Sequence, residues 1–297
     1  MIDKFVKQIV LPQANSHKGE NGRVLVIGGS RLFHAASFWS ACMASKIVDM
    51  VHFSSPMIEN NELMRVRAKA KFWEGIVVPW EEVEHYIEED DCVLIGPGMV
   101  RETNQKTKIP ENQSEARTSE IVNYLLAKYP DKRWVVDGGA LQEVEPSLLN
   151  KNMIITPNVR ELAILIAKNP KSEILNPKQI LNQNDQNSKR EQVTVLAKGP
   201  VDVVSQWSMV NGQWSKETLE ISGGSAGMTK GGTGDVLAGI VVGLYAKSPA
   251  LASCVVASQA NKRAGEELEK KLGPFFSASD LIPEVQTVLG EMLDMEL

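Results

Sequence analysis

The sequence predicts an α/β fold of three layers, in which a mainly parallel sheet lies between two layers of helices. Short continuous apolar runs such as Val24–Ile27 and Cys92–Ile95 are typical of parallel strands that are covered on both faces. These runs alternate with helical segments along the whole chain, and several of them end directly in glycine turns. We therefore expect one domain over residues 1–297.

Composition excludes several classes of protein. The 297 residues carry a net charge of -5, and Lys and Arg are scattered along the chain, so no nucleic-acid partner is expected. The amino-terminal segment lacks the apolar centre of a signal peptide, and no apolar run has the length of a membrane span. These features predict a cytoplasmic protein without a membrane partner. Cys42, Cys92 and Cys254 are expected to be buried thiols.

In the first third of the chain, strands are expected at Val24–Ile27, Met50–Ser54, Gly75–Val78 and Cys92–Ile95, and helices at Ala35–Val48 and Trp80–Glu89. The first and last of these strands run into GGS and GPG turns. In parallel sheets ligands bind at the carboxyl ends of the strands, so Gly28-Gly29, Gly96 and Gly98 are expected to converge on one crevice. An ordinary tight turn also explains GPG. The GGSRLF segment lacks the GxGxxG spacing of a dinucleotide fold.

Residues 101–119 are polar and contain a proline, which predicts a mobile insertion within the domain. Beyond it we expect a helix at Glu120–Tyr129, strands at Arg133–Val136, Met153–Thr156 and Val193–Ala197, and helices near 233–246, 250–272 and 279–295. The polar stretch Lys171–Arg190 is helix or loop. A hairpin that turns at Asn211-Gly212 is expected to form a wall for a nucleotide base.

The segment Gly223–Gly239 carries the strongest chemical signal in the sequence. Gly231, Gly232 and Gly234 suit a turn whose N–H groups point inward, and the buried helix that follows directs its positive end to the same point. Such a place binds phosphate. Asp235 in the first helical turn is then positioned to accept a proton from a hydroxyl group undergoing phosphorylation. The alternative is a helix-capping aspartate behind a structural turn.

Polar residues also follow other strands of the predicted sheet. Asp137 ends a strand and is expected to face the site. Asn158 and Glu161 share one face of a helical turn, so they either approach a hydrated cation or form a capping arrangement. Lys198 either contacts phosphate or is a solvated lysine at a strand end.

Six blocks in this order, HKGENGRVLVIGGS, VLIGPGM, VVDGGAL, ITPNVREL, LAKGPVDVV and GMTKGGTGDVLAG, resemble the ribokinase-like NAD(P)H-hydrate dehydratases over about residues 17–270. The resemblance implies a ribokinase-like fold and the repair of damaged nicotinamide cofactor. Family members dehydrate (6S)-NADHX or (6S)-NADPHX to NADH or NADPH and consume ATP or ADP. It implies that the C6 hydroxyl is phosphorylated and that phosphate is then eliminated.

The resemblance also implies roles for individual residues. Asp235 corresponds to the catalytic base, and Gly232, Thr233 and Gly234 to the anion hole. The nucleotide-binding positions are Lys198, Gly199, Pro200, Val201, Asp202, Gly231 and Gly234. The substrate positions are Ala35, Gly98, Asp137, Asn158 and Asp235. Asn158 and Glu161 match the pattern that organises Mg²⁺ through water in the wider superfamily. His34, Val100 and Gly139 depart from the family pattern on the substrate side.

Three hypotheses about function follow. The first is the nucleotide-dependent dehydratase, with Mg²⁺ and with ATP or ADP as the phosphoryl donor. The second is a ribokinase-like kinase for a vitamin precursor or a sugar, and the third is a nucleotide-sensing module without turnover. The resemblance further implies a homo-oligomer, a tetramer. A fused epimerase domain is not expected, because only a short segment precedes Lys18.

Overall fold

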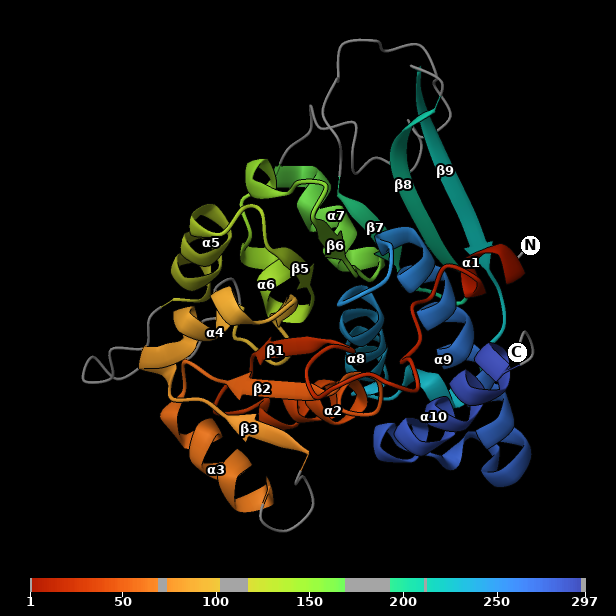
Figure 1. Ribbon diagram of the computed structural model, residues 1–297, viewed down its shortest axis with the longest axis horizontal. Helices are drawn as coiled ribbons and strands as arrows, with labels where there is room; N and C mark the ends of the chain where they lie inside the picture. The colour runs from red at the N-terminus through yellow and green to blue at the C-terminus, as the bar shows by residue number, and fades with distance from the viewer. Residues whose placement is uncertain (1, 69–73, 102–116, 169–192, 211–212, 295–297) are drawn as a thin grey trace.

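Nine strands form one sheet in the part of the chain that the computed structural model describes, which is residues 2–68, 74–101, 117–168, 193–210 and 213–294 (Figure 1). The strand order is β3-β2-β1-β4-β5-β6-β7-β8-β9. Strands β1 to β7 pair in parallel, and β8 and β9 continue the sheet as an antiparallel hairpin. The strands are β1 (Arg23–Ile27), β2 (Met50–Ser54), β3 (Gly75–Val77), β4 (Cys92–Ile95), β5 (Arg133–Val136), β6 (Met153–Ile155), β7 (Thr194–Ala197), β8 (Asp202–Val210) and β9 (Gln213–Ile221).

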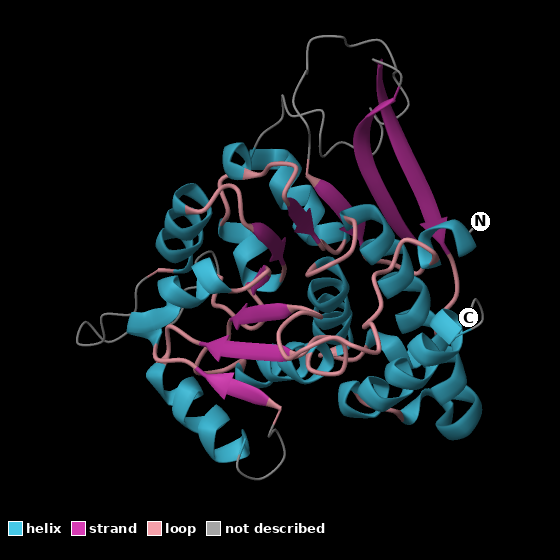
Figure 2. Ribbon diagram, viewed as in Figure 1, coloured by secondary structure: helices cyan, strands magenta, loops and turns pink. Residues whose placement is uncertain are grey.

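Helices cover both faces of this sheet (Figure 2). The core on one face includes residues of α1 (Asp3–Val6), α2 (His34–Ala44), α3 (Ile58–Ala68), α8 (Thr233–Tyr245), α9 (Ala250–Leu272) and α10 (Ala278–Asp294). The core on the other face includes residues of α4 (Val83–Glu89), α5 (Thr118–Lys128), α6 (Gly138–Glu143) and α7 (Val159–Lys168). Short 3-10 turns lie at Trp80–Glu82, Pro146–Leu148, Ala226–Thr229 and Gly273–Phe275. The predicted three-layer α/β/α fold with a mainly parallel sheet is confirmed.

The two cores follow from the alternation of side chains along the strands. On β1, Val24 and Val26 belong to the core beneath α2 and α8, whereas Leu25 and Ile27 belong to the core beneath α4 and α5. All four side chains are fully buried. Because successive residues of a strand point to opposite faces, a strand between two helical layers has no position that faces solvent, which explains the continuous apolar runs in the sequence.

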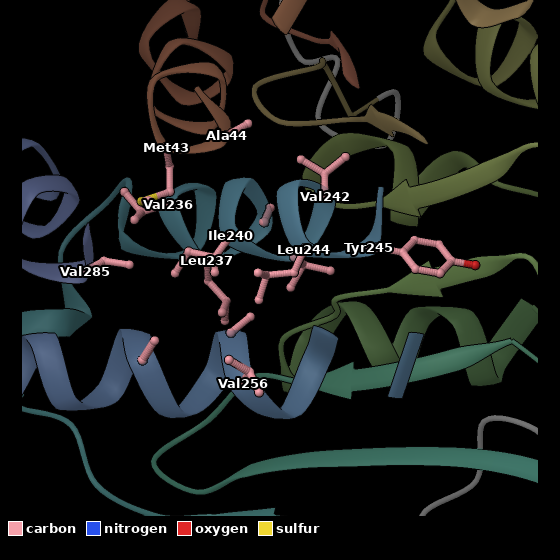
Figure 3. Close-up of a cluster of buried hydrophobic side chains, with 14 of the residues drawn as sticks. Met43, Ala44, Val236, Leu237, Ile240, Val242, Leu244, Tyr245, Val256 and Val285 are labelled. Atoms are coloured by element: carbon pink, nitrogen blue, oxygen red, sulfur yellow. The ribbon is translucent and has the colours of Figure 1, made fainter. Parts of the chain in front are cut away.

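Helix α8 lies at the centre of the larger core. Its residues Val236–Tyr245 are all buried, and Figure 3 shows them between Met43 and Ala44 of α2 on one side and Val256 of α9 on the other. Two glycines of α8 permit the close approach of α2. A Cβ atom at Gly239 would lie 2.5 Å from the carbonyl oxygen of Ser40, and one at Gly243 would lie 2.9 Å from Ile47.

Several boundaries differ from the expectations. The helix expected at Ala35–Val48 spans His34–Ala44, and the one expected at Trp80–Glu89 divides into a 3-10 turn and α4. The sequence analysis missed α3, whose sequence IENNELMRVRA carries few apolar residues, and the six-residue α6. The turn at Asn211-Gly212, the stretch Lys171–Arg190 and residues 102–116 of the expected insertion lie outside the described residues.

No helix among the described residues combines the length and apolar character needed to cross a membrane.

The turn after β4 yields a test of the fold. A Cβ atom at Gly96 would lie 1.8 Å from the carbonyl oxygen of Asp137, and the φ of Gly96 is +119°. We expect Gly96→Ala to lower the free energy of unfolding by at least about 2 kcal/mol, because strain of the backbone adds to the clash. Chemical denaturation measures this.

Gly290→Ala is the matched control, since no atom lies within 4 Å of its Cβ position in the exposed face of α10. That substitution should stabilise the protein by roughly 0.5–1 kcal/mol. Equal effects of the two substitutions would contradict the geometry of the turn.

Candidate active site

The glycine turns after β1 and β4 meet at the carboxyl end of the sheet, as the sequence predicts. The N–H of Gly29 donates a hydrogen bond of 2.7 Å to the carbonyl oxygen of Pro97. Gly98 has a φ of +72°, and a Cβ atom there would lie 2.2 Å from the carbonyl oxygen of Phe33. Gly98 therefore packs against the start of α2, whose first turn contains Ala35. The turns after β1 and β4 and the start of α2 therefore lie side by side at this edge of the sheet.

The three residues that the resemblance marks as departures on the substrate side lie near these turns. His34 and Val100 are exposed, the first at the start of α2 and the second just beyond the GPG turn. Gly139 lies under that turn, and a Cβ atom there would lie 2.2 Å from the carbonyl oxygen of Met99. A larger residue at 139 thus requires a different path of the turn, which is the physical reason for glycine here.

The first turn of α8 is built as the glycine-rich segment predicts. Gly232 precedes the helix with a left-handed φ of +99°, and its Cβ position would lie 2.5 Å from the ring of Trp39. The first hydrogen bond of the helical pattern runs from the N–H of Val236 to the carbonyl oxygen of Gly232. The N–H groups of Thr233, Gly234 and Asp235 therefore have no helical acceptor and remain available to an anion.

The side chains beside this turn hold it in place. The hydroxyl of Thr233 donates to the carbonyl oxygens of Met228 at 2.7 Å and Lys230 at 3.0 Å. The ammonium group of Lys230 donates hydrogen bonds to the carbonyl oxygens of Pro274 and Phe276, so it ties the turn to the segment that precedes α10. The buried hydroxyl of Thr233 therefore holds the turn, while its N–H remains one of those available to an anion.

Asp235 is not the capping residue of α8, because Gly232 occupies that position. The Asp235 carboxylate accepts no hydrogen bond from the described residues, although the hydroxyl of Ser40 donates to its backbone oxygen at 2.8 Å. Burial and the nearby carboxylates of Asp137 and Glu161 raise the pKa of Asp235 from 3.8 to about 7, against the opposing effect of Lys198. A carboxylate with this pKa is matched to proton transfer near neutral pH.

Lys198 lies between these carboxylates. Its ammonium group donates a hydrogen bond of 2.6 Å to Asp137, and the hydroxyl of Thr156 donates to the same carboxylate oxygen at 2.5 Å. Burial alone lowers the pKa of Lys198, but the charges of Asp137, Glu161 and Asp235 outweigh it and raise the pKa. Lys198 is therefore an ammonium ion that Asp137, itself expected to bind substrate, orients from the end of β5.

Asn158 and Glu161 adopt the capping arrangement. The side-chain oxygen of Asn158 accepts hydrogen bonds from the N–H groups of Arg160 and Glu161, at 2.9 and 3.0 Å. The Glu161 carboxylate in turn accepts from the N–H of Asn158 at 2.9 Å and pairs with Arg101 at 3.4 Å. Both lone pairs of the Asn158 oxygen are used, so Asn158 does not fit a metal ligand. The Glu161 carboxylate suits a cation bound through water.

A cleft of about 580 Å³ adjoins the anion site, and Lys198 is part of its lining. It is lined by Lys198, Gly199, Pro200, Asp202, Gly223, Gly224, Ser225, Ala226, Met228, Thr229, Thr233, Gly234, Leu237, Asn261, Lys262 and Glu269. Most of the predicted nucleotide-binding residues lie here, whereas Val201 and Gly231 are exposed and do not line it. The start of β8 at Asp202 and the glycines that follow β9 line the cleft, and the expectation that the hairpin forms a wall for a nucleotide base stays a prediction.

Helix α9 supplies residues that the sequence analysis missed. Lys262 is only 4% exposed, and its ammonium group donates to the carbonyl oxygens of Gly199, Pro200 and Gly223 at 3.0 to 3.4 Å. The carboxylate of Glu266 accepts from the N–H of Gly224 at 2.9 Å. These contacts fix both ends of the hairpin against α9. The sequence signal was a lysine in an otherwise buried helical face.

A comparison with protein families matches residues 24–287 to the model described as NAD(P)H-hydrate dehydratase. The chain belongs to the NAD(P)H-hydrate dehydratase family. It is 31% identical to the ADP-dependent (S)-NAD(P)H-hydrate dehydratase of Nitrosopumilus maritimus, over 97% of this chain and 94% of that protein. It is also 31% identical to the bifunctional NAD(P)H-hydrate repair enzyme of Methanocaldococcus jannaschii. That match covers 93% of this chain but only 50% of the length of the relative.

Solved structures support the fold of the family. A ribokinase-like superfamily protein from Enterococcus faecalis superimposes with a TM-score of 0.75 at 21% identity, over 98% of this chain and 95% of that one. The ADP/ATP-dependent NAD(P)H-hydrate dehydratase of Bacillus subtilis, co-crystallised with ATP/Mg²⁺, superimposes with a TM-score of 0.67 at 17% identity, over 98% and 97% of the two chains. The expected ribokinase-like fold is therefore confirmed.

The pKa of Asp235 is directly measurable. Carbon NMR of the aspartate carboxyl groups in the free protein should show one group with a midpoint near 7. Asp137→Asn should lower this midpoint, because it removes a negative charge that disfavours the Asp235 carboxylate and frees Lys198 from its partner. An Asp235 midpoint near 4 in the unmodified protein would contradict the arrangement of charges.

Proposed function

We propose that this protein repairs hydrated nicotinamide cofactor, by the nucleotide-dependent dehydration of (6S)-NADHX or (6S)-NADPHX to NADH or NADPH. The observation that carries the proposal is a cleft that meets an anion site with a basic carboxylate. The cleft contains Lys198 and the first turn of α8 in its lining and suits a nucleotide, and Asp235 lies in that same turn. The family and the curated relatives support the same activity.

The residues of the site divide into two roles in this proposal. The N–H groups of the first turn of α8 and the ammonium group of Lys198 bind the phosphoryl group during its transfer. Asp235 accepts the proton of the C6 hydroxyl as that oxygen attacks phosphorus and the nucleotide departs. Phosphate then leaves C6 with the C–O bonding electrons, the ring nitrogen donates its pair, and the neighbouring ring carbon loses a proton to restore the dihydropyridine.

Asp137 acts through Lys198 and does not touch the reacting atoms. Its hydrogen bonds with Lys198 and Thr156 hold the ammonium group at the end of β7, 3.5 Å from the Cβ position of Gly234. Asp137 is therefore a positioning residue in this proposal. Ala35 and Gly98 shape the wall that faces the hydrate.

Mg²⁺ fits the site in part. Glu161 offers a buried carboxylate, while the side chain of Asn158 is used by the capping arrangement. We assign Glu161 to hold Mg²⁺ through water together with the nucleotide phosphates, where the ion would neutralise phosphate charge.

The proposal is tested by incubating the protein with the S hydrate, Mg²⁺ and either ATP or ADP. Recovery of absorbance near the NADH band with one nucleotide is the expected result. A stable phosphorylated product that accumulates without elimination would identify a kinase instead. Nucleotide binding without turnover of the hydrate would identify a sensing module.

Asp235→Asn separates the catalytic role from a structural one. We expect turnover to fall by about 10² to 10⁴, because a general base is lost, while the dissociation constant of the nucleotide stays within about twofold. Steady-state kinetics and calorimetry measure the two effects. Turnover near that of the unmodified protein would exclude Asp235 as the base.

The stability of the same variant provides the control. Because the folded pKa of Asp235 lies above 3.8, this group lowers stability progressively as pH rises from about 4 to 7. Asp235→Asn should therefore unfold at a higher temperature than the unmodified protein at pH 8. A helix-capping role predicts the opposite, a loss of roughly 1 kcal/mol.

A further inference from the structure

The loop that precedes α8 packs on a short segment at the start of α10, residues 274–279, which we call the platform. A Cβ atom at Gly227 would lie 2.5 Å from the ring of Phe276, and one at Gly232 would lie 2.7 Å from the Cβ of Ala278. Neither position has room for a side chain, so the loop and the platform are in direct contact. The start of α10 is therefore part of the surroundings of the anion site.

Trp39 of α2 joins the same contact. Its ring lies 2.5 Å from the Cβ position of Gly232, and its indole N–H donates to the hydroxyl of Ser279 at 3.1 Å. Apolar contact of this kind is not directional, so packing alone does not fix the orientation of the N–H groups that the loop carries into α8. Hydrogen bonds between the loop and the platform are needed to fix it.

Lys230 supplies such hydrogen bonds. Its ammonium group donates to the carbonyl oxygens of Pro274 and Phe276, the second at 2.7 Å, and lies 5.5 Å from the centre of the Phe276 ring. The backbone oxygen of Lys230 accepts from the hydroxyl of Thr233, the first residue of α8, at 3.0 Å. The next residue, Gly231, is exposed, and no described atom lies within 4 Å of its Cβ position. Lys230 thus links the platform to the first turn of α8 across a part of the loop that has little packing of its own.

We propose that Lys230 is a positioning residue for the phosphates of the nucleotide, an inference that rests on the proposed use of this site by ATP or ADP. Its ammonium group acts through the loop, because its hydrogen bonds go to the platform. A loop that is ordered before the anion arrives loses less conformational entropy on binding, which raises the affinity for phosphate. The effect is confined to ligands that carry phosphate, since Lys230 does not line the adjoining cleft.

Calorimetry with ADP and with adenosine, which lacks phosphate, tests this role by binding alone. Lys230→Met and Lys230→Gln both remove the ammonium group, and each should weaken ADP binding roughly 3- to 20-fold, as expected for the net loss of one or two hydrogen bonds. Both variants should bind adenosine within about twofold of the unmodified protein. Lys230→Arg, which can donate to both carbonyl oxygens, should restore the affinity for ADP.

Lys271→Met is the matched control. Lys271 is also an exposed lysine that bonds to α10, through both carboxylate oxygens of Glu284 at 2.8 Å, but it has no printed bond to the loop and does not line the cleft. This substitution should leave the affinities for ADP and adenosine unchanged. It separates the contact between Lys230 and the platform from a general loosening of α10.

Amide hydrogen exchange in the free protein gives a second measurement that does not depend on a ligand. The amides of Gly231 and Gly232 should exchange faster in Lys230→Met than in the unmodified protein, whereas Lys271→Met should not change them. Unchanged exchange at both glycines would overturn the proposal even if ADP binds more weakly.

Other outcomes also decide. The proposal is wrong if both neutral variants bind ADP as the unmodified protein does, if adenosine binding falls as much as ADP binding, or if Lys230→Arg restores nothing. An unmodified protein that does not bind ADP would overturn it together with the proposed function. ADP binding that depends on Lys230, in a protein that does not dehydrate the hydrate, would remove the proposed function and leave this inference standing.

Discussion

The burial of α8 on all sides fixes the geometry of the site. A helix whose residues Val236–Tyr245 are packed between the sheet, α2 and α9 cannot shift along its axis without opening the core, so its first turn has a defined position. Gly232, in a left-handed conformation against Trp39, ends the preceding loop at that point. The unpaired N–H groups of the first turn are therefore preorganised for an anion, which is the condition for electrostatic stabilisation of a transferred group.

The charges beside that turn explain why Lys198 determines the electrostatics of the site. Asp137, Glu161 and Asp235 bring three carboxyl groups from three different elements to one place, and Lys198 interacts with each of them. Burial and mutual repulsion keep the Asp235 carboxyl basic enough to take a proton near pH 7. The attraction of the same negative charges for the ammonium group raises the pKa of Lys198 and keeps it charged. The basicity of Asp235 and the charge of Lys198 thus have one cause, and neither follows from its residue alone.

The sequence predicted the layers and most of the strands, because each strand of a parallel sheet between helices is a run of apolar residues, and several of these runs end in glycine. It also brought Asp235, Lys198 and Gly234 together, since strand ends and helix starts share one edge. It left two interpretations open for Asn158 and Glu161, and only the hydrogen bonds decide for the capping arrangement. Helix α3 was missed because its sequence has little apolar periodicity.

The contribution of α9 to the cleft could not be predicted from the sequence, for a different reason. Lys262 and Glu266 act by fixing loops that are distant in the chain, at Gly199 and Gly224, and no local pattern encodes such a partner. A buried lysine in a helix is a weak signal until its acceptors are known. The tertiary packing of α9 against the hairpin ends therefore determines the cleft, while the motifs determine only the end of it that faces Lys198.

The position of α8 in the core also separates the anion turn from the residues that the resemblance marks as departures on the substrate side. His34 begins α2, Val100 follows the GPG turn, and Gly139 lies in α6 beneath that turn. Phosphoryl transfer as proposed needs the fixed amides, the ammonium group and the base, and the core holds these. The segments that carry the three departures can change without moving α8. A fold with this separation can keep one phosphoryl-transfer apparatus while the group that accepts the phosphate varies.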